Sequence, residues 1–190
     1  MTNLIESKIV RHCSLIIFLV LLSKLSMAQT KPFVPIDFKV PDNFENQHFR
    51  LRMLTVNDVV KDYDAVMTSI DHLRDFDGPG TKWPSKDLTL EQDLIDLGWH
   101  QKEFQKRRSF TFTVVSLDEA EVFGCLYIFP TEKIGYNAEV TMWVRQSAYE
   151  KGLDPILFTT VKNWISVEWP FKKIGYPGRE LSWEEWNSIK

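Results

Sequence analysis

The sequence has 190 residues, of which 44% are hydrophobic, and its formal net charge is −3. This length suits one domain with a substantial core. The acidic balance, with no basic stripe beyond residues 106–108, argues against a nucleic-acid-binding protein. Of the two cysteines, Cys13 and Cys125, only Cys125 lies in the expected domain, which excludes an intrachain disulfide and a cysteine-based metal site there.

The N-terminus has the pattern of a secretory signal peptide. Lys8 and Arg11 precede an apolar run at residues 14–22, and residues 26–28 form a small-x-small cleavage signal. The run is shorter than the roughly 20 apolar residues that span a bilayer. We therefore expect residues 1–28 to be a signal peptide and the protein to be exported, periplasmic or secreted. If translation starts at Met27 instead, the protein is cytoplasmic.

The next segments predict an arm, a strand and a helix. Residues 29–47 are rich in proline, lysine and aspartate and are expected to form an extended arm before a domain of residues 48–190. Residues 48–54 alternate apolar and polar side chains, which predicts a half-buried strand. Thr55 and Asp58 form a capping-box pattern. The helix that follows repeats apolar residues at helical spacing, namely Val59, Tyr63, Val66, Met67 and Ile70.

The middle of the chain predicts a loop, a helix and a hairpin. Residues 75–84 form a Gly/Pro-rich loop with two aromatic residues. A second helix is predicted from about residue 90 to 107, with Leu90, Leu94, Leu97 and Phe104 on its core face. Residues 110–115 and 122–129 read as two strands of a hairpin.

Residues 138–144 predict a further strand. Val140, Met142 and Val144 alternate with Glu139, Thr141 and Trp143 on opposite faces. After a loop with Lys151 and Gly152, Asp154 is the expected N-cap of a helix with Pro155 at its first position.

That helix is predicted to end near residue 168, with Leu157, Val161, Trp164 and Ile165 on its core face. Residues 171–176 predict a short strand, and residues 182–189 a short helix. The whole order predicts an α+β fold, in which a mostly antiparallel central sheet is flanked by helices.

This order, with the segments LRMLTVNDVVKDYDAVMTS, WPSKDLTLEQDLIDLGWHQKEF, GCLYIFP and AEVTMWVR, resembles the GNAT acetyltransferase superfamily over residues 49–176. The resemblance implies a GNAT-like, acyl-CoA N-acyltransferase fold and acetyl-CoA as co-substrate. In that superfamily the backbone of the fourth strand, here residues 138–144, pairs with the pantetheine, and the pyrophosphate lies on the following loop. The implied cofactor-binding residues are Met142, Val144, Arg145, Lys151, Gly152 and Leu153.

The loop departs from the superfamily's Gln/Arg-x-x-Gly-x-Gly/Ala form, because only Gly152 matches it. As an N-cap, Asp154 would occupy one backbone donor and add a negative charge, and Pro155 removes a second donor. Lys151 and Arg145 could offset the charge. The departures favour weak or altered cofactor binding, and a segment kept for folding alone is the alternative.

Acetyl transfer to an amine needs a base and donors that polarise the thioester carbonyl. Glu139 is the candidate base and Tyr176 the candidate proton donor, with Tyr149 a nearby alternative. A solvated Glu139 and purely packing tyrosines are the competing interpretations. His100 is of the right type near neutral pH, although we expect it at the surface of its helix.

The candidate substrate-binding residues lie in the loop between the first helices, which often shapes the acceptor pocket in GNAT proteins. They are Asp75, Phe76, Asp77 and Trp83. Carboxylates there would suit an amine, although turn chemistry accounts for aspartate and Gly-Pro equally. No metal-binding motif is present, so we expect no metal.

We therefore predict a GNAT-family acetyltransferase that transfers an acetyl group from acetyl-CoA directly to an unknown small-molecule or peptide amine. No nucleic-acid partner and no stable membrane insertion after signal cleavage are expected. The alternative is an exported, catalytically silent GNAT-fold binding module, favoured by the signal peptide and by Asp154 and Pro155.

Overall fold

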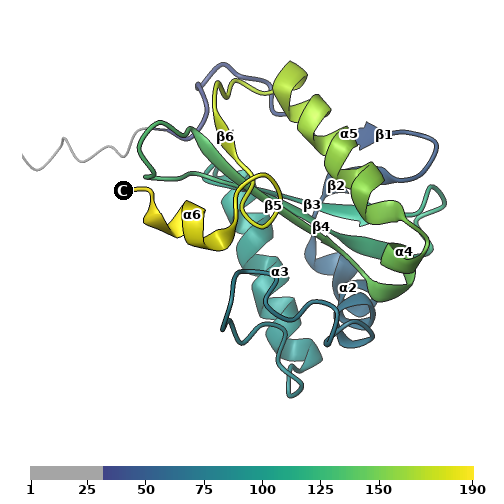
Figure 1. Ribbon diagram of the computed structural model, residues 1–190. Coiled ribbons are helices and arrows are strands. Elements are labelled where there is room, and N and C mark those ends of the chain that lie inside the picture. The colour runs from purple at the N-terminus through teal and green to yellow at the C-terminus, as the bar shows by residue number, and fades with distance from the viewer. Residues whose placement is uncertain (1–31) are drawn as a thin grey trace, which may run out of the picture. The chain divides into compact units, whose positions relative to one another are not determined.

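The strands form one six-stranded sheet in the computed structural model, which describes residues 32–190 (Figure 1). They lie side by side in chain order, the first five antiparallel and the last parallel to its neighbour. They are β1 (Asn43–Glu45), β2 (Arg50–Met53), β3 (Phe110–Val115), β4 (Val122–Phe129), β5 (Ala138–Val144) and β6 (Ile174–Gly175). The predicted α+β class and mostly antiparallel sheet are confirmed.

Helices cover both faces of this sheet (Figure 1). On one face lie α2 (Val59–Met67), entered through the 3₁₀ turn η1 (Val56–Asp58), and α3 (Leu90–Gln105). On the other face lies α5 (Leu153–Glu168), which follows the short helix α4 (Gln146–Glu150) in the chain. The last helix of the chain is α6 (Trp183–Ser188). The predicted capping pattern is present, since the Asp58 carboxylate accepts from Thr55 N–H at 2.9 Å. A hydrogen bond between residues three positions apart thus stabilises the start of the first helical segment.

The predicted signal peptide and the beginning of the predicted arm lie outside the described residues. Within residues 32–190, Phe33–Lys190 form one compact unit. None of the helices in this described part has the length and apolar character needed to cross a membrane.

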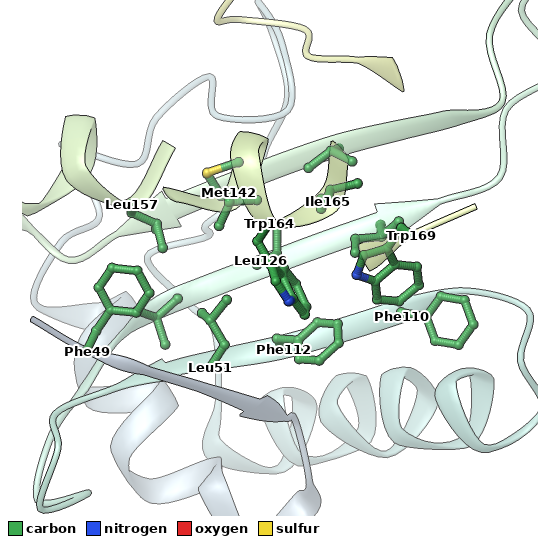
Figure 2. Close-up of a cluster of buried hydrophobic side chains, with 14 of the residues drawn as sticks. Phe49, Leu51, Phe110, Phe112, Leu126, Met142, Leu157, Trp164, Ile165 and Trp169 are labelled. Carbon is green, nitrogen blue, oxygen red and sulfur yellow. The ribbon is translucent and has the colours of Figure 1, made fainter. Parts of the chain in front are cut away.

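The α5 face holds a core of aliphatic and aromatic side chains (Figure 2). Phe112 contacts Trp164 edge to face, with 5.4 Å between the ring centroids. The predicted core face of α5 is confirmed, because Leu157, Val161, Trp164 and Ile165 are all buried. Period-3.6 apolar spacing thus identified the helix that closes this side of the sheet.

The face of α3 that packs on the sheet differs from the prediction. Leu90 and Leu94 are 45% and 42% exposed, whereas Leu97 and Phe104 are buried as expected. The other buried side chains of α3 are polar, namely Asp93, His100 and Glu103. Positions 93, 97, 100 and 104 still follow helical spacing. A prediction based on apolar residues alone therefore chose a different face of the helix from the one that is buried.

Three element boundaries also differ. The strand β1 lies inside the predicted arm, because Phe44 pairs with Leu51 and packs on Trp164. The helix α4 occupies part of the predicted loop. The strand β6 covers two residues, not six. Before it, the backbone N–H groups of Lys172 and Lys173 donate to Asn137 Oδ1 at 3.0 Å, so they are bonded to a side chain and not to the backbone of β5.

Candidate functional site

The sheet opens between β5 and β6. These parallel strands pair only at Ala138 with Ile174 and at Glu139 with Gly175. Beyond that point the chain turns away through Gly178, whose φ of +73° favours glycine. A cavity of about 410 Å³ lies along the unpaired end of β5. It reaches from the loop after α2 to the first turn of α5, so one continuous space connects the sheet edge with a helix N-terminus.

The first turn of α5 corrects the prediction for Asp154. Gly152 is the N-cap, in the left-handed conformation at φ +79°, and the helix begins at Leu153. Pro155 is therefore the third helical residue, where its missing N–H breaks no intrahelical bond. Because glycine adopts this conformation without a Cβ clash, the chain enters the helix two residues earlier than the capping pattern suggested.

The carboxylate of Asp154 binds the guanidinium of Arg179 instead of a backbone amide. The two contacts are 2.5 and 2.6 Å long, a bidentate geometry. The side chains are 13% and 25% exposed, respectively. Gly152 provides no side-chain cap, and a Cβ added there would meet no atom within 4 Å. The first turn thus keeps an open backbone approach, which anions favour at helix N-termini.

Two side chains already hold the free edge of β5. Arg179 Nη2 donates to the carbonyl oxygen of Met142 at 3.2 Å. His72 Nε2 lies 3.1 Å from the carbonyl oxygen of Val144, and the ring packs on Tyr149. A ligand that pairs with these two carbonyl groups must share or displace these contacts. Sequence reasoning missed both, because neither is near β5 in the chain.

The remaining predicted cofactor residues are spread around this opening. Arg145 is buried and pairs with Asp64 at 2.9 Å and with Glu121 at 3.4 Å. Lys151 and Leu153 line a separate cavity of about 250 Å³. The cation of the 410 Å³ cavity is therefore Arg179, while Arg145 ties β5 to α2 and to the hairpin.

The two predicted catalytic residues lie on opposite faces of the sheet. Glu139 accepts from Trp186 Nε1 at 3.2 Å, and burial raises the pKa of its carboxyl. Tyr176 belongs to the α5-side core, packs edge to face on Phe158, and burial raises the pKa of its hydroxyl. Within residues 32–190, that hydroxyl has no hydrogen-bond partner. The fold does not bring this pair together.

The predicted acceptor loop lines two neighbouring cavities. Asp75 and Phe76 line the 410 Å³ cavity, and the Asp75 carboxylate also accepts from Gly80 N–H at 2.9 Å, which is turn chemistry. Phe76, Asp77 and Trp83 line a second cavity of about 200 Å³. Three of the four predicted substrate-binding residues therefore share one pocket.

The 200 Å³ cavity also contains His100, which is 7% exposed, so the expected surface position is wrong. The Nδ1 atom lies 2.9 Å from Thr111 Oγ1, and Nε2 lies 3.6 Å from a carboxylate oxygen of Asp96. Burial lowers the pKa of the imidazole, partly offset by the charge of Asp96. The spacing of His100 from Leu97 and Phe104, three and four residues away, was the available signal for its burial.

A buried polar network lies beside this cavity. Cys125 Sγ donates to Asp62 Oδ1 at 3.2 Å, and Trp143 Nε1 donates to Tyr127 Oη at 3.1 Å. Burial, and then the charge of Asp93, raise the pKa of Asp62 to about 7. Burial raises the pKa of Cys125 as well, so this thiol is a protonated, packed group and not a nucleophile. Residues 32–190 contain no cluster of side chains suited to a metal ion.

Solved acetyltransferases are similar to this chain. The ribosomal-protein-S5-alanine acetyltransferase of Vibrio fischeri is 18% identical with a TM-score of 0.52, and the match covers 65% of this chain and 66% of that one. The Salmonella typhimurium acetyltransferase that modifies the N-terminal serine of ribosomal protein L7/L12 is 13% identical with a TM-score of 0.55, covering 69% and 71%. Spermidine N-acetyltransferase from Vibrio cholerae, solved with CoA and spermine, is 14% identical with a TM-score of 0.50, covering 69% and 71%.

This chain has the GNAT fold. The chain spans just under two thirds of the length of the Vibrio fischeri enzyme. No protein-family model and no curated protein matches the sequence.

Proposed function

We propose that this protein is an acetyl-CoA-dependent N-acetyltransferase that transfers the acetyl group directly to an amine. The observation that carries the proposal is the 410 Å³ cavity, which joins the unpaired edge of β5 to the first turn of α5. The similar GNAT acetyltransferases, one of them solved with CoA and spermine, support the same reading.

The residues at this opening fit the thioester substrate. Asp154 lines this opening and offers a backbone amide in the first turn of α5, where a phosphate group is favoured. Arg179 adds a cation there once Asp154 releases it, and the Met142 and Val144 carbonyl oxygens are acceptors for amide groups of the substrate. The pairing of Asp154 with Arg179 supports the proposal, since Asp154 does not consume a backbone donor as the sequence suggested.

Calorimetric titration of the full chain with acetyl-CoA tests this proposal. We expect saturable binding in the micromolar range, about −8 kcal/mol. Asp154→Asn removes the charge that holds Arg179 and should tighten binding about fivefold, whereas Arg179→Gln should weaken it about tenfold. Glu168→Gln, at the other end of α5, is the matched control and should change nothing. If Arg179→Gln tightens binding instead, Arg179 blocks the site and does not bind phosphate.

A second candidate function rests on the occupied edge of β5. Because Arg179 and His72 already contact the carbonyl oxygens of Met142 and Val144, the chain also fits a catalytically silent binding module. In that case neither the native chain nor Asp154→Asn gives heat with millimolar acetyl-CoA, although both remain folded by circular dichroism.

Export is a further part of the proposal and rests on the sequence of residues 1–28 alone. N-terminal sequencing of the endogenous protein should find Gln29 as the first residue. A cytosolic protein that begins at Met27 would contradict export and would place the chain in the compartment where acetyl-CoA is made.

A further inference from the structure

The 200 Å³ cavity has aromatic walls. The rings of Phe76 and Trp83 are 5.6 Å apart, and Tyr127 stacks on Phe129 with 5.9 Å between centroids and 9° between planes. His100 closes one side, 5.1 Å from the Tyr127 ring. The π faces of aromatic rings attract organic cations, most strongly where water is excluded. The aromatic rings that line the cavity therefore favour a small organic cation as the ligand.

The carboxylates of Asp77 and Asp96 line this cavity. Its lining residues all belong to the described part of the chain, and none of them is a lysine or an arginine. Two other acidic side chains of the fold are matched by guanidinium groups, Asp154 by Arg179 and Asp58 by Arg52. Among residues 32–190, the basic side chain that pairs with Asp96 is the imidazole of His100, at 3.6 Å, which carries a charge only when it is protonated. The pair of carboxylates thus lacks a permanent counter-charge.

The imidazole of His100 has one nitrogen anchored and one facing the cavity. With its hydrogen on Nδ1, the ring donates to Thr111 Oγ1 at 2.9 Å. Within residues 32–190, Nε2 has no hydrogen bond, and its nearest charged neighbour is Asp96. Burial lowers the pKa of the imidazole, so near pH 7 the ring is neutral, and in the tautomer with its hydrogen on Nδ1 it presents the Nε2 lone pair to a bound ligand.

The aromatic cavity and the 410 Å³ cavity share two wall residues, Phe76 and Thr141. Thr141 is buried on the face of β5 that points toward α3. A molecule held between the aromatic rings is therefore separated from the larger cavity by only this shared wall.

We propose that the aromatic cavity binds a small primary ammonium ion whose charge faces Asp77 and Asp96, and that His100 Nε2 is the base that deprotonates it. The second part rests on the proposed acetyl transfer. The ammonium nitrogen gives one proton to Nε2, and its freed lone pair forms a bond to the thioester carbonyl carbon. The carbon–sulfur bond breaks with its electrons on sulfur, the thiolate takes the second proton from nitrogen, and the imidazolium returns its proton to water.

Benzylammonium and benzyl alcohol, which match in shape but not in charge, test the binding step in the full chain without acetyl-CoA. We expect saturable binding of benzylammonium by calorimetry and at least about tenfold weaker binding of the alcohol. Asp96→Asn should weaken the cation about fivefold, while Asp87→Asn, an exposed aspartate outside the cavity, is the control. Equal binding of the two probes, or no binding of either, would overturn the proposal.

His100→Gln tests the base in a chain whose fold is verified by thermal unfolding. Benzylammonium should still bind within about twofold, whereas its acetylation should fall about 100-fold, the range of general-base effects. The groups that face His100 are Asp96 on α3, Asp77 in the loop and Tyr127 on β4, so the native pH–rate profile should lose one inflection in His100→Gln. An unchanged profile would mean that His100 only packs.

The outcomes separate this inference from the proposed function. If acetyl-CoA binds and benzylammonium does not, the inference fails while acetyl transfer to another acceptor stands. If benzylammonium binds and acetyl-CoA does not, the acetyltransferase proposal and the role of His100 as base fail together, and the aromatic cavity remains a cation-binding site.

Discussion

The two faces of the sheet bury different kinds of side chain. The α5 face is filled by aliphatic and aromatic side chains, as Figure 2 shows. The face under α2 and α3 buries charged and hydroxyl groups among its apolar side chains, namely Asp58, Asp62, Asp93, His100, Thr111, Thr113 and Thr141. Apolar burial stabilises without directional partners, whereas buried polar groups need them. The aromatic cavity lies on the second face, so the face that depends on partners is also the one that can recognise a ligand.

Most polar groups of the α2/α3 face are well matched. Asp58 accepts from Arg52 at 2.6 and 2.9 Å and from the Thr55 amide at 2.9 Å. Asp62 and Asp93 are the exceptions, since no cation pairs with either within residues 32–190 and one oxygen of Asp93 has no partner there. Burial raises the pKa of Asp93 to about 6. Burial thus shifts both carboxyls toward the protonated form in the folded chain, relative to an exposed aspartate.

The largest effect is expected on the apolar face. Phe112→Ala removes a fully buried ring that contacts Phe104 and Trp164, and it should lower the free energy of unfolding by about 3–5 kcal/mol. Urea unfolding monitored by circular dichroism measures this loss. Val167→Ala, at a side chain that is 73% exposed on α5, is the matched control and should change stability by less than about 0.5 kcal/mol. A small loss in Phe112→Ala would mean that this core is loosely packed.

The same contrast explains how much of the fold the sequence predicted. Strands β3, β4 and β5 and the core face of α5 were predicted correctly, because most of their buried positions are apolar and those on the α5 side recur at the period of a strand or helix. The core face of α3 was not, because Asp93, His100 and Glu103 share it. A method that recognises burial by apolarity must fail on a helix that buries polar residues.

The site was predicted less completely. Phe76, Asp77 and Trp83 were placed in one acceptor loop by sequence, and they do line one cavity. Arg179 and His72 contact β5 from segments 37 and 72 residues away, and only the tertiary fold brings these segments to the strand. Local motifs locate loops, whereas the side chains that meet across an opening require the three-dimensional arrangement.

The buried carboxyl of Asp62 makes the stability of the polar face depend on pH. Its pKa is about 7 in the folded chain, against 3.8 for the ordinary side chain. The stabilisation linked to its protonated form is therefore complete below about pH 4 and is lost as pH rises through about 7. Asp62→Asn does not titrate, so between these pH values it should gain on the order of 2–4 kcal/mol relative to the native chain.

Urea unfolding at a series of pH values from 4 to 8 measures this difference. The exposed Asp87→Asn is the control and should run parallel to the native chain across the range. A constant difference between Asp62→Asn and the native chain would show that the pKa of Asp62 is the same in the folded and unfolded chains, and it would contradict the shift caused by burial.

The smallest effect is expected at Thr111, where a substitution separates a packing role from a positioning role on the polar face. Thr111→Val keeps the shape of a fully buried side chain but removes the hydroxyl that holds His100 Nδ1, so it should lower the free energy of unfolding by about 1 kcal/mol. Without that acceptor, the tautomer with its hydrogen on Nε2 is favoured, because Nε2 lies beside the carboxylate of Asp96. Nitrogen NMR of His100 should therefore show the Nδ1–H tautomer in the native chain and in Thr111→Ser, and the Nε2–H tautomer in Thr111→Val. A ring whose hydrogen is on Nε2 presents a donor to the cavity and no longer a base. If all three chains share one tautomer, the hydroxyl serves packing alone, and the polar face would in this respect be no different from the apolar one.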